Sequence, residues 1–221
     1  HLRAAFPFSG YADGGIITTG GNSASPRARR QWRRAQRLYE FVSRNKNIPF
    51  LGKQMFRLLD RLLRIPPYYP IRDRSRPTFQ VALLEKCIRD GLYDSLTERI
   101  SGSGLPLLAT FYAPAIAAEK AGFKNIFCVI TDTDANRVWV PRDPGKSRIR
   151  YLVPSSVAYG RLLQYGVRKR NIFLTGFPIS DALTGGKDRH VMHHALAKRL
   201  RNLDPDGAFG KNFAESVIRE L

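Results

Sequence analysis

The side chains best suited to bind or activate a substrate lie in short turns that follow predicted strands. Each turn comes directly after an apolar run and combines hydroxyl, carboxylate, amide or aromatic groups with glycine or proline. Ligands of an open parallel sheet bind beyond the carboxyl ends of its strands, so these turns are where a site is expected. The candidates are Phe111 after the first run, Thr131, Asp132, Asn136, Arg137 and Trp139 after the second, Pro154 and Ser155 after the third, and Gly176, Pro178 and Ser180 after the fourth.

Two patterns resemble metal sites, and neither is favoured. Asp132 and Asp134 lie close together, but no third carboxylate or histidine is near them in the sequence, and hard cations take more oxygen ligands than two residues supply. His190, His193 and His194 have the spacing of one helix face, which zinc could use. On a helix rich in Arg and Lys, that spacing is more typical of a solvated face. The chain also has no P-loop, no G-x-G-x-x-G, no Cys-x-x-Cys and no serine elbow. We therefore expect neither a metal nor a bound cofactor.

The candidate turns need a sheet to position them, and the second half of the chain predicts one. Apolar runs alternate with short helical segments at residues 115–121 and 156–165. Strands that are apolar throughout and separated by helices indicate a parallel sheet covered on both faces. The fold class is therefore α/β, a Rossmann-like doubly wound parallel sheet. The predicted strands are residues 105–110, 125–130, 149–153 and 171–175.

The first half of the chain is mainly helical in its pattern. A short helix over residues 1–12 should bend at Pro7. Residues 14–21 are a β-branched run between glycines, either a strand end or a loop. Ser25 and Pro26 form an N-cap and first-turn pair that opens a helix. The predicted helices are residues 27–44, 49–64 and 79–100, with 190–202 and 209–221 after the last strand.

Charge is the strongest compositional signal. The chain of 221 residues carries 37 Lys and Arg against 18 Asp and Glu, a net charge of +19. Such a surplus attracts polyanions, namely nucleic acid, anionic lipid or phosphorylated substrates, unless it is simply a basic surface. The helices over 27–44 and 49–64 are amphipathic and basic, and such helices can lie on an anionic membrane, although an apolar stripe more often faces the core. The candidate membrane contacts are Arg29, Arg30, Arg33, Arg37, Lys53, Arg57 and Arg61.

The location of the protein follows from its cysteines and its hydropathy. Cys87 and Cys128 both lie in apolar runs and cannot form a disulfide scaffold, which fits a reduced, cytosolic compartment. No apolar run approaches the roughly 18 residues that span a bilayer. We expect a cytoplasmic protein, peripheral on the inner face of the membrane.

Four short motifs occur in order within residues 126–180. They are the Thr131-Asp132 turn with Trp139 downstream, the strand end Val153-Pro154-Ser155, the helix end Leu163-Gln164-Tyr165-Gly166-Val167, and the turn Gly176-Phe177-Pro178-Ile179. In these motifs and their order the segment resembles the acceptor-side domain of GT-B glycosyltransferases. It is similar to monogalactosyldiacylglycerol synthase, processive diacylglycerol glucosyltransferases and the lipid-linked N-acetylglucosamine transferase of peptidoglycan assembly.

The resemblance implies a reaction and a site. It implies an inverting, metal-independent transfer of a hexose from a nucleotide sugar to a lipid or polyprenyl-linked hydroxyl, with the turn residues above binding the acceptor. It also places His1 where the family has a histidine at the start of its first helix. A histidine there feels the positive end of the helix dipole, stays neutral near pH 7 and can take a proton from the acceptor. His1 is accordingly the candidate catalytic base. The alternative is that His1 is only the point at which the sequence has been cut.

The same resemblance implies a domain organisation. Residues 1–185 would form the acceptor-binding domain, without its first strand and Gly-rich turn and with a helical insertion at about 26–100. Residues 186–221 would lead to a donor-binding domain that this chain lacks, so the chain alone is expected to be inactive. The family usually has a histidine near Asn136, and Thr133, Asp134 and Ala135 also depart from it. Asparagine can hydrogen-bond an acceptor but cannot act as a base, so the acceptor stays open.

Two other functions remain alternatives. A nucleic-acid-binding module could use the Arg27–Arg37 cluster, whose interleaved aromatics include Trp32. It is less favoured, because those aromatics lie mainly on the apolar face of the helix and no nucleic-acid-binding motif is present. A nucleotide-sugar epimerase would keep the GT-B fold and change the reaction.

Overall fold

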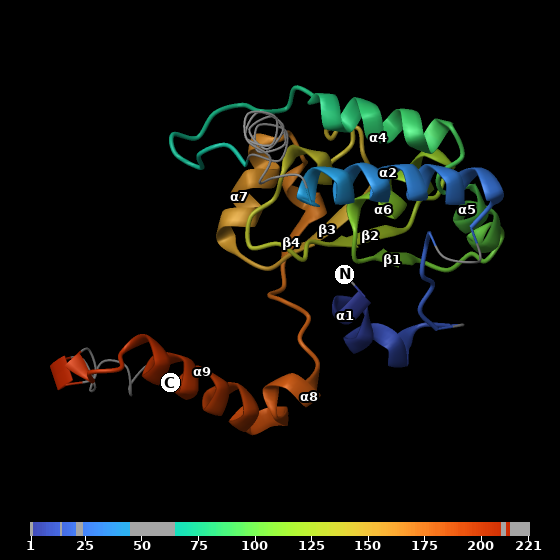
Figure 1. The fold of residues 1–221 in the computed structure, drawn as a ribbon. Helices are drawn as coiled ribbons and strands as arrows, with labels where there is room; N and C mark the ends of the chain where they lie inside the picture. Colours follow the sequence, from blue (N-terminus) through green and yellow to red (C-terminus); the bar gives the residue numbers. More distant parts are fainter. Residues whose placement is uncertain (1, 14, 21–23, 45–64, 209–210, 213–221) are drawn as a thin grey trace.

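The computed structural model describes residues 2–13, 15–20, 24–44, 65–208 and 211–212, and it has an α/β fold (Figure 1). Its sheet contains four parallel strands in the order β1-β2-β3-β4. All four predicted strands are confirmed, each shorter than its apolar run. Their bounds are Leu107–Ala109 for β1, Ile126–Val129 for β2, Arg150–Val153 for β3 and Ile172–Leu174 for β4.

Helices connect most of the strands. Helix α6 (Tyr112–Lys120) lies between β1 and β2, and α7 (Ser156–Gln164) lies between β3 and β4. The β2–β3 connection is instead a long loop with one turn of 3-10 helix, η3 (Arg137–Trp139). A second 3-10 turn, η4 (Lys169–Asn171), leads into β4. This parallel order brings the carboxyl ends of all four strands to one edge of the sheet.

The N-terminal helices begin largely where the sequence predicts. The first segment divides into α1 (Leu2–Ala5) and the 3-10 helix η1 (Phe6–Tyr11), with Pro7 in the first turn of η1. Residues 15–20 form a loop rather than a strand end. Helix α2 (Pro26–Arg44) opens as expected, because Ser25 Oγ accepts a hydrogen bond from the Ala28 N–H at 3.1 Å. The predicted helix over residues 49–64 lies outside the described residues.

The prediction of one helix over residues 79–100 is wrong. The structure has two helices there, α4 (Phe79–Arg89) and α5 (Asp94–Ile100). Gly91 separates them with a φ of +88°, a conformation that side-chain-bearing residues rarely adopt. A Cβ at Gly91 would also lie 2.6 Å from a carboxylate oxygen of Asp94.

The two faces of the sheet differ in how well they are covered. Strand register places Ile126, Cys128, Tyr151 and Val153 on one face, and all four are fully buried. Helices α2, α4 and α6 are stacked above the strands in the view of Figure 1. On the opposite face Leu108 and Phe173 are 37% and 43% exposed, and the Arg150 guanidinium lies 5.2 Å from the centre of the Phe127 ring. Among the described residues, cover is therefore complete over the centre of one face and partial at Leu108 and Phe173 on the other.

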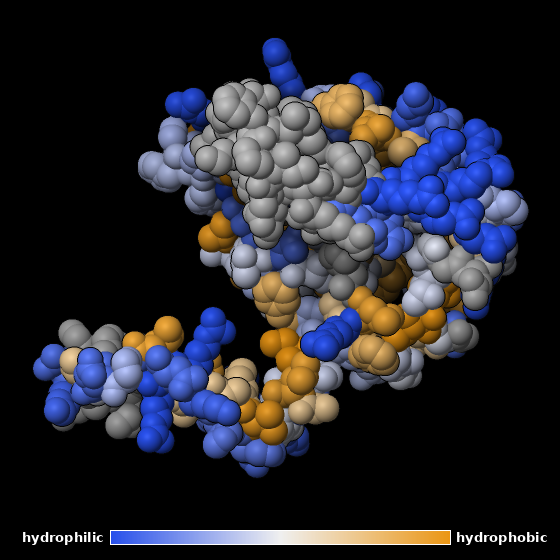
Figure 2. All heavy atoms as spheres, viewed as in Figure 1, coloured by the Kyte–Doolittle hydropathy of each residue, from blue (hydrophilic) through white to orange (hydrophobic). Residues whose placement is uncertain are grey.

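Helix α2 packs on the body of the protein through its apolar side. The Trp32 ring meets the Tyr93 ring edge to face at 6.1 Å, and the Gln31 amide donates to the carbonyl of Asp90 at 3.0 Å. The opposite side of the helix carries arginines that are exposed to solvent. Figure 2 shows these strongly hydrophilic side chains gathered over α2; they are Arg29, Arg30, Arg33, Arg34 and Arg37.

A buried carboxylate ties α4 to the rest of the fold. Glu85 is 4% exposed and makes ion pairs with Lys120 of α6 at 3.2 Å and with Arg142 of the β2–β3 loop at 3.0 Å. Burial alone would raise the pKa of Glu85, but hydrogen bonds from Arg142 and Lys120 more than offset it, so the pKa lies below its ordinary value.

The C-terminal helices form an arm that extends away from the sheet (Figure 1). It comprises α8 (Asp181–Thr184), the 3-10 turn η5 (Gly186–Asp188) and α9 (His190–Leu203). The helix predicted at 190–202 is confirmed, and the one at 209–221 falls almost entirely outside the described residues. Neither α8 nor α9 buries a residue.

Candidate functional site

The turn after β2 holds the best-defined polar group at the carboxyl edge of the sheet. Asp132 is exposed there, next to the half-buried Thr131. The indole N–H of Trp139 donates a hydrogen bond to Asp132 Oδ2 at 3.1 Å. Trp139 itself is 2% exposed, and its main-chain carbonyl accepts from the Tyr151 hydroxyl at 3.2 Å. A carboxylate facing solvent is therefore held by a hydrogen bond from a buried, closely packed side chain.

Two aromatic side chains complete this group, Phe111 from the turn after β1 and Tyr112 from the first turn of α6. The ring centres of Phe111 and Tyr112 lie 6.1 Å and 5.2 Å from that of Trp139, in edge-to-face contacts. Burial raises the pKa of Tyr112, and the nearby charge of Asp132 raises it further. The structure thus brings together four of the predicted acceptor residues, Phe111, Thr131, Asp132 and Trp139, and adds Tyr112.

Asp134, two residues further on, has a structural partner. Both of its carboxylate oxygens accept hydrogen bonds from Arg161 of α7, at 2.9 Å and 2.6 Å, and Oδ1 also accepts from the Ala135 N–H at 2.7 Å. Arg161 is 1% exposed, and its bond to Asp134 raises its pKa. Asp132 and Asp134 are each engaged by a different side chain and do not form a paired metal site.

Further contacts fix the segment before α4 against α7. The Arg161 guanidinium lies over the Tyr68 ring, 5.2 Å from its centre, and the Gln164 amide donates to the Tyr68 carbonyl at 3.3 Å. Gly160 makes this approach possible, because a Cβ at that position would lie 2.1 Å from the Tyr68 hydroxyl oxygen. The 65–76 segment therefore lies directly on the surface of α7.

The turns after β3 and β4 border the same edge. The Ser155 hydroxyl donates to the carbonyl of Thr133 at 2.9 Å and accepts from the Ala158 N–H at 3.1 Å, which caps α7 and ties it to the β2 turn. Gly176 has a φ of +81°, and with Pro178 and Ser180 it forms the link from β4 to α8. These three residues share the edge with Asp132, but β3 lies between them and the β2 turn.

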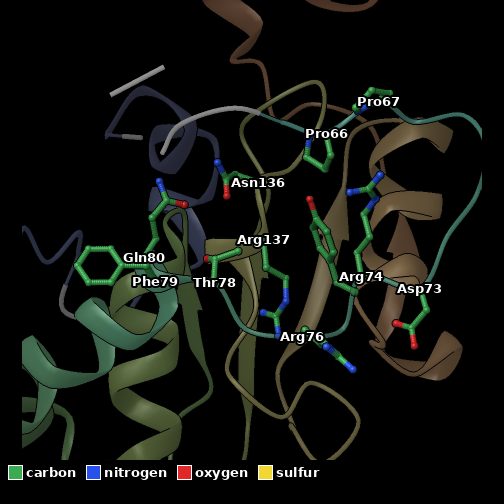
Figure 3. A pocket seen from close by; sticks show the side chains of 11 residues that line it. Pro66, Pro67, Asp73, Arg74, Arg76, Thr78, Phe79, Gln80, Asn136 and Arg137 are labelled. Atoms are coloured by element: carbon green, nitrogen blue, oxygen red, sulfur yellow. The ribbon is translucent and has the colours of Figure 1, made fainter. Parts of the chain in front are cut away.

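A cavity of about 700 Å³ opens between the segment before α4 and the β2–β3 loop (Figure 3). Arg137, one of its lining residues, is buried and uses its two terminal nitrogens to donate to main-chain carbonyls. The acceptors are Val140 and Pro141, both at 3.0 Å, Ser75 at 2.6 Å and Arg142 at 3.1 Å. The cavity is lined by Pro66, Pro67, Asp73, Arg74, Arg76, Thr78, Phe79, Gln80, Asn136, Arg137 and Tyr165.

Sequence reasoning missed the contribution of Arg74 and Arg161. Arg74 lies between the predicted helices at 49–64 and 79–100, and no motif marks it. Arg161 had a detectable signal, because it stands among the buried positions of α7, between Ala158 and Leu162. A charged residue at a core position of a helix indicates a buried partner.

The remaining predicted residues lie away from this edge or outside the described residues. Arg29, Arg30, Arg33 and Arg37 are on the exposed side of α2. The histidines of α9 are on the C-terminal arm, and no group of three or more potential metal ligands occurs in the part of the chain that the structure describes. Four predicted residues fall outside it, namely His1, Lys53, Arg57 and Arg61.

Comparisons of the chain with protein-family models, with curated proteins and with solved structures give no match. Among the described helices, none is long and apolar enough to cross a bilayer.

Proposed function

We propose that this chain is the acceptor-binding half of a GT-B glycosyltransferase that moves a hexose from a nucleotide sugar to a lipid or polyprenyl-linked hydroxyl at a membrane surface. The observation that carries the proposal is the hydrogen bond from Trp139 to Asp132. This bond joins the Thr-Asp turn to the tryptophan downstream of it, and these two motifs are central to the resemblance. It does so at the edge of the sheet where ligands of such folds bind.

The geometry suits the binding of a hydroxyl group. The exposed Asp132 carboxylate can accept a hydrogen bond from the acceptor hydroxyl, and its fixed orientation reduces the entropy lost on binding. In the transfer, the acceptor oxygen bonds to the anomeric carbon, the bond from that carbon to the phosphate oxygen breaks, and the nucleoside diphosphate leaves. The hydroxyl proton goes to a general base, for which the resemblance nominates His1. The nucleotide sugar would bind mainly to a further domain.

Transfer by the full protein tests this proposal. Radiolabel from a nucleotide hexose should appear in the organic phase when diacylglycerol or a polyprenyl phosphate is the acceptor. Asp132→Asn should lower kcat/KM for the acceptor about tenfold to a hundredfold, because it removes a hydrogen bond to a charged group. Asp188→Asn, the same change on the exposed η5 turn, should leave the rate unchanged. Absence of transfer from every nucleotide hexose, or equal rates for the two variants, contradicts the proposal.

The arginines of α2 are the proposed membrane contact. Each basic residue near an anionic surface contributes about 1 kcal/mol, so Arg30→Gln with Arg33→Gln should weaken binding to anionic vesicles about 30-fold. Co-sedimentation with phosphatidylserine vesicles measures this. The control is Lys124→Gln with Arg170→Gln, which removes the same charge from exposed positions elsewhere. Equal losses in the two double variants would indicate only a net-charge effect.

The packing of α2 bears on the nucleic-acid alternative. Trp32 is engaged by Tyr93 and lies against Gly20, where a Cβ would be 3.2 Å from the indole. It is therefore not presented to solvent as a surface on which a base could stack. This observation favours the membrane contact over the nucleic-acid module.

A further inference from the structure

The cavity beside the β2–β3 loop contains an excess of positive charge. Among the described residues three arginines line it, Arg74, Arg76 and Arg137, against one carboxylate, Asp73. Asp73 Oδ1 is occupied by the Ser75 N–H at 2.8 Å within its own turn. Figure 3 shows the Arg74 side chain extending toward Pro67, whereas Arg76 and Asp73 point away from it. Arg74 is therefore the arginine that the fold directs along the cavity.

Two buried donors in the lining have no acceptor. The Nε atoms of Arg74 and Arg137 are both buried and have no hydrogen-bond partner among the described residues. Leaving a buried donor of a charged group unsatisfied costs more than leaving a neutral one unsatisfied. In native structures a ligand or ordered water often meets such groups. The terminal nitrogens of Arg137 are satisfied by neutral carbonyl oxygens, so they receive no compensating negative charge there.

Size and wall chemistry restrict the ligand. Cavities of roughly 300–1,000 Å³ hold organic molecules, and this one measures about 700 Å³, far larger than a bare anion. Its wall combines the arginines with the apolar surfaces of Pro66, Pro67 and Phe79. A neutral ligand would leave the guanidinium charges unpaired, and a cation would be repelled. A tetrahedral phosphoryl group offers several oxygens to separate guanidinium N–H donors.

We infer that this cavity binds an organic phosphate monoester with an apolar substituent. The phosphoryl oxygens accept from the Arg74 guanidinium, the buried charge of Arg137 adds to the attraction, and the apolar substituent lies against the proline and phenylalanine surfaces. This inference rests on the proposed function, because it names the class of acceptor, but the binding requires no nucleotide sugar and no transfer and can be tested apart from them.

Calorimetric titration with three probes separates the contribution of the phosphoryl group to binding from that of the apolar substituent. Farnesyl phosphate, below its micelle concentration, should bind most tightly. Farnesol should bind about tenfold to a hundredfold more weakly, because it lacks the charged hydrogen-bond acceptor. Inorganic phosphate should also bind more weakly, because it buries no apolar surface. Equal affinity for farnesyl phosphate and farnesol would overturn the inference.

Variants locate the site. Arg74→Gln should lower the affinity for farnesyl phosphate about tenfold or more. Arg72→Gln should not, because Arg72 is an exposed arginine of the same segment that does not line the cavity. Arg74→Lys, which keeps the charge and loses the guanidinium geometry, should give an intermediate affinity. Equal losses for Arg74→Gln and Arg72→Gln would overturn the assignment.

The variant at position 74 is expected to fold. The contact that anchors this residue is made by its main chain, whose N–H donates to the Gln164 carbonyl at 2.7 Å. Circular dichroism checks the fold of each variant. If Arg74→Gln fails to fold, the wild-type comparison of farnesyl phosphate with farnesol still decides the question. Failure of binding would leave the transfer to diacylglycerol unaffected, and failure of transfer would leave this binding unaffected.

Discussion

Asp134→Ala should lower the free energy of unfolding by about 3 kcal/mol. The stability is lost mainly at Arg161, the partner of Asp134. Arg161 is 1% exposed and would be left as a buried cation without its counter-charge. The Ala135 N–H would lose its acceptor as well. Urea unfolding at neutral pH, followed by far-UV circular dichroism, measures the change.

A double variant distinguishes loss of charge pairing from loss of packing. Replacing a buried ion pair with apolar residues of similar size is often neutral. Asp134→Leu combined with Arg161→Met should therefore recover most of the stability that Asp134→Ala removes. A double variant as unstable as Asp134→Ala would show that the pair is needed for reasons other than its charge, such as the contacts of Arg161 with Gln164 and the Pro67 carbonyl.

Trp139→Ala should cost about 4 kcal/mol of stability, because truncating a large buried aromatic leaves a cavity that the surroundings fill only in part. The rings of Phe111 and Tyr112 would also lose their edge-to-face partner. Thermal and urea unfolding give the magnitude. A loss below about 1 kcal/mol would contradict the packing described for this residue.

Trp139→Phe separates packing from positioning. Phenylalanine fills most of the same space but cannot donate to Asp132, so the fold should persist while the carboxylate loses its anchor. Acceptor kcat/KM should then fall with little change in stability, in the same direction as for Asp132→Asn. Wild-type transfer by Trp139→Phe would show that the hydrogen bond does not position Asp132 for the reaction.

The sequence predicts the sheet well and the helical half less well. Buried parallel strands are continuous apolar runs, as in residues 125–130, and their short length between turn residues favours strands over helices. Where the pattern failed, one residue decided the outcome. Gly91 interrupts an otherwise helical apolar period, and only its positive φ and the adjacent Asp94 explain why α4 and α5 are separate.

The β2 turn and the cavity also differ in how far the sequence predicts them. The β2 turn was predictable, because strand ends and turn chemistry are local signals, and Asp132 and Trp139 are only seven residues apart. The cavity was not, because it depends on contacts such as the Arg137 hydrogen bond to the Ser75 carbonyl, which spans 62 positions of the chain. No local sequence pattern predicts that the 65–76 segment folds back onto α7.

That fold-back has a consequence for how the sequence can change over evolution. Tyr68 can lie on α7 because position 160 has no side chain. A larger residue at position 160 would require a smaller residue at position 68 or a displacement of Tyr68, so substitutions at these two positions should tend to occur jointly among homologues. A lineage that keeps Tyr68 but replaces Gly160 should have remodelled the loop and, with it, the wall of the cavity.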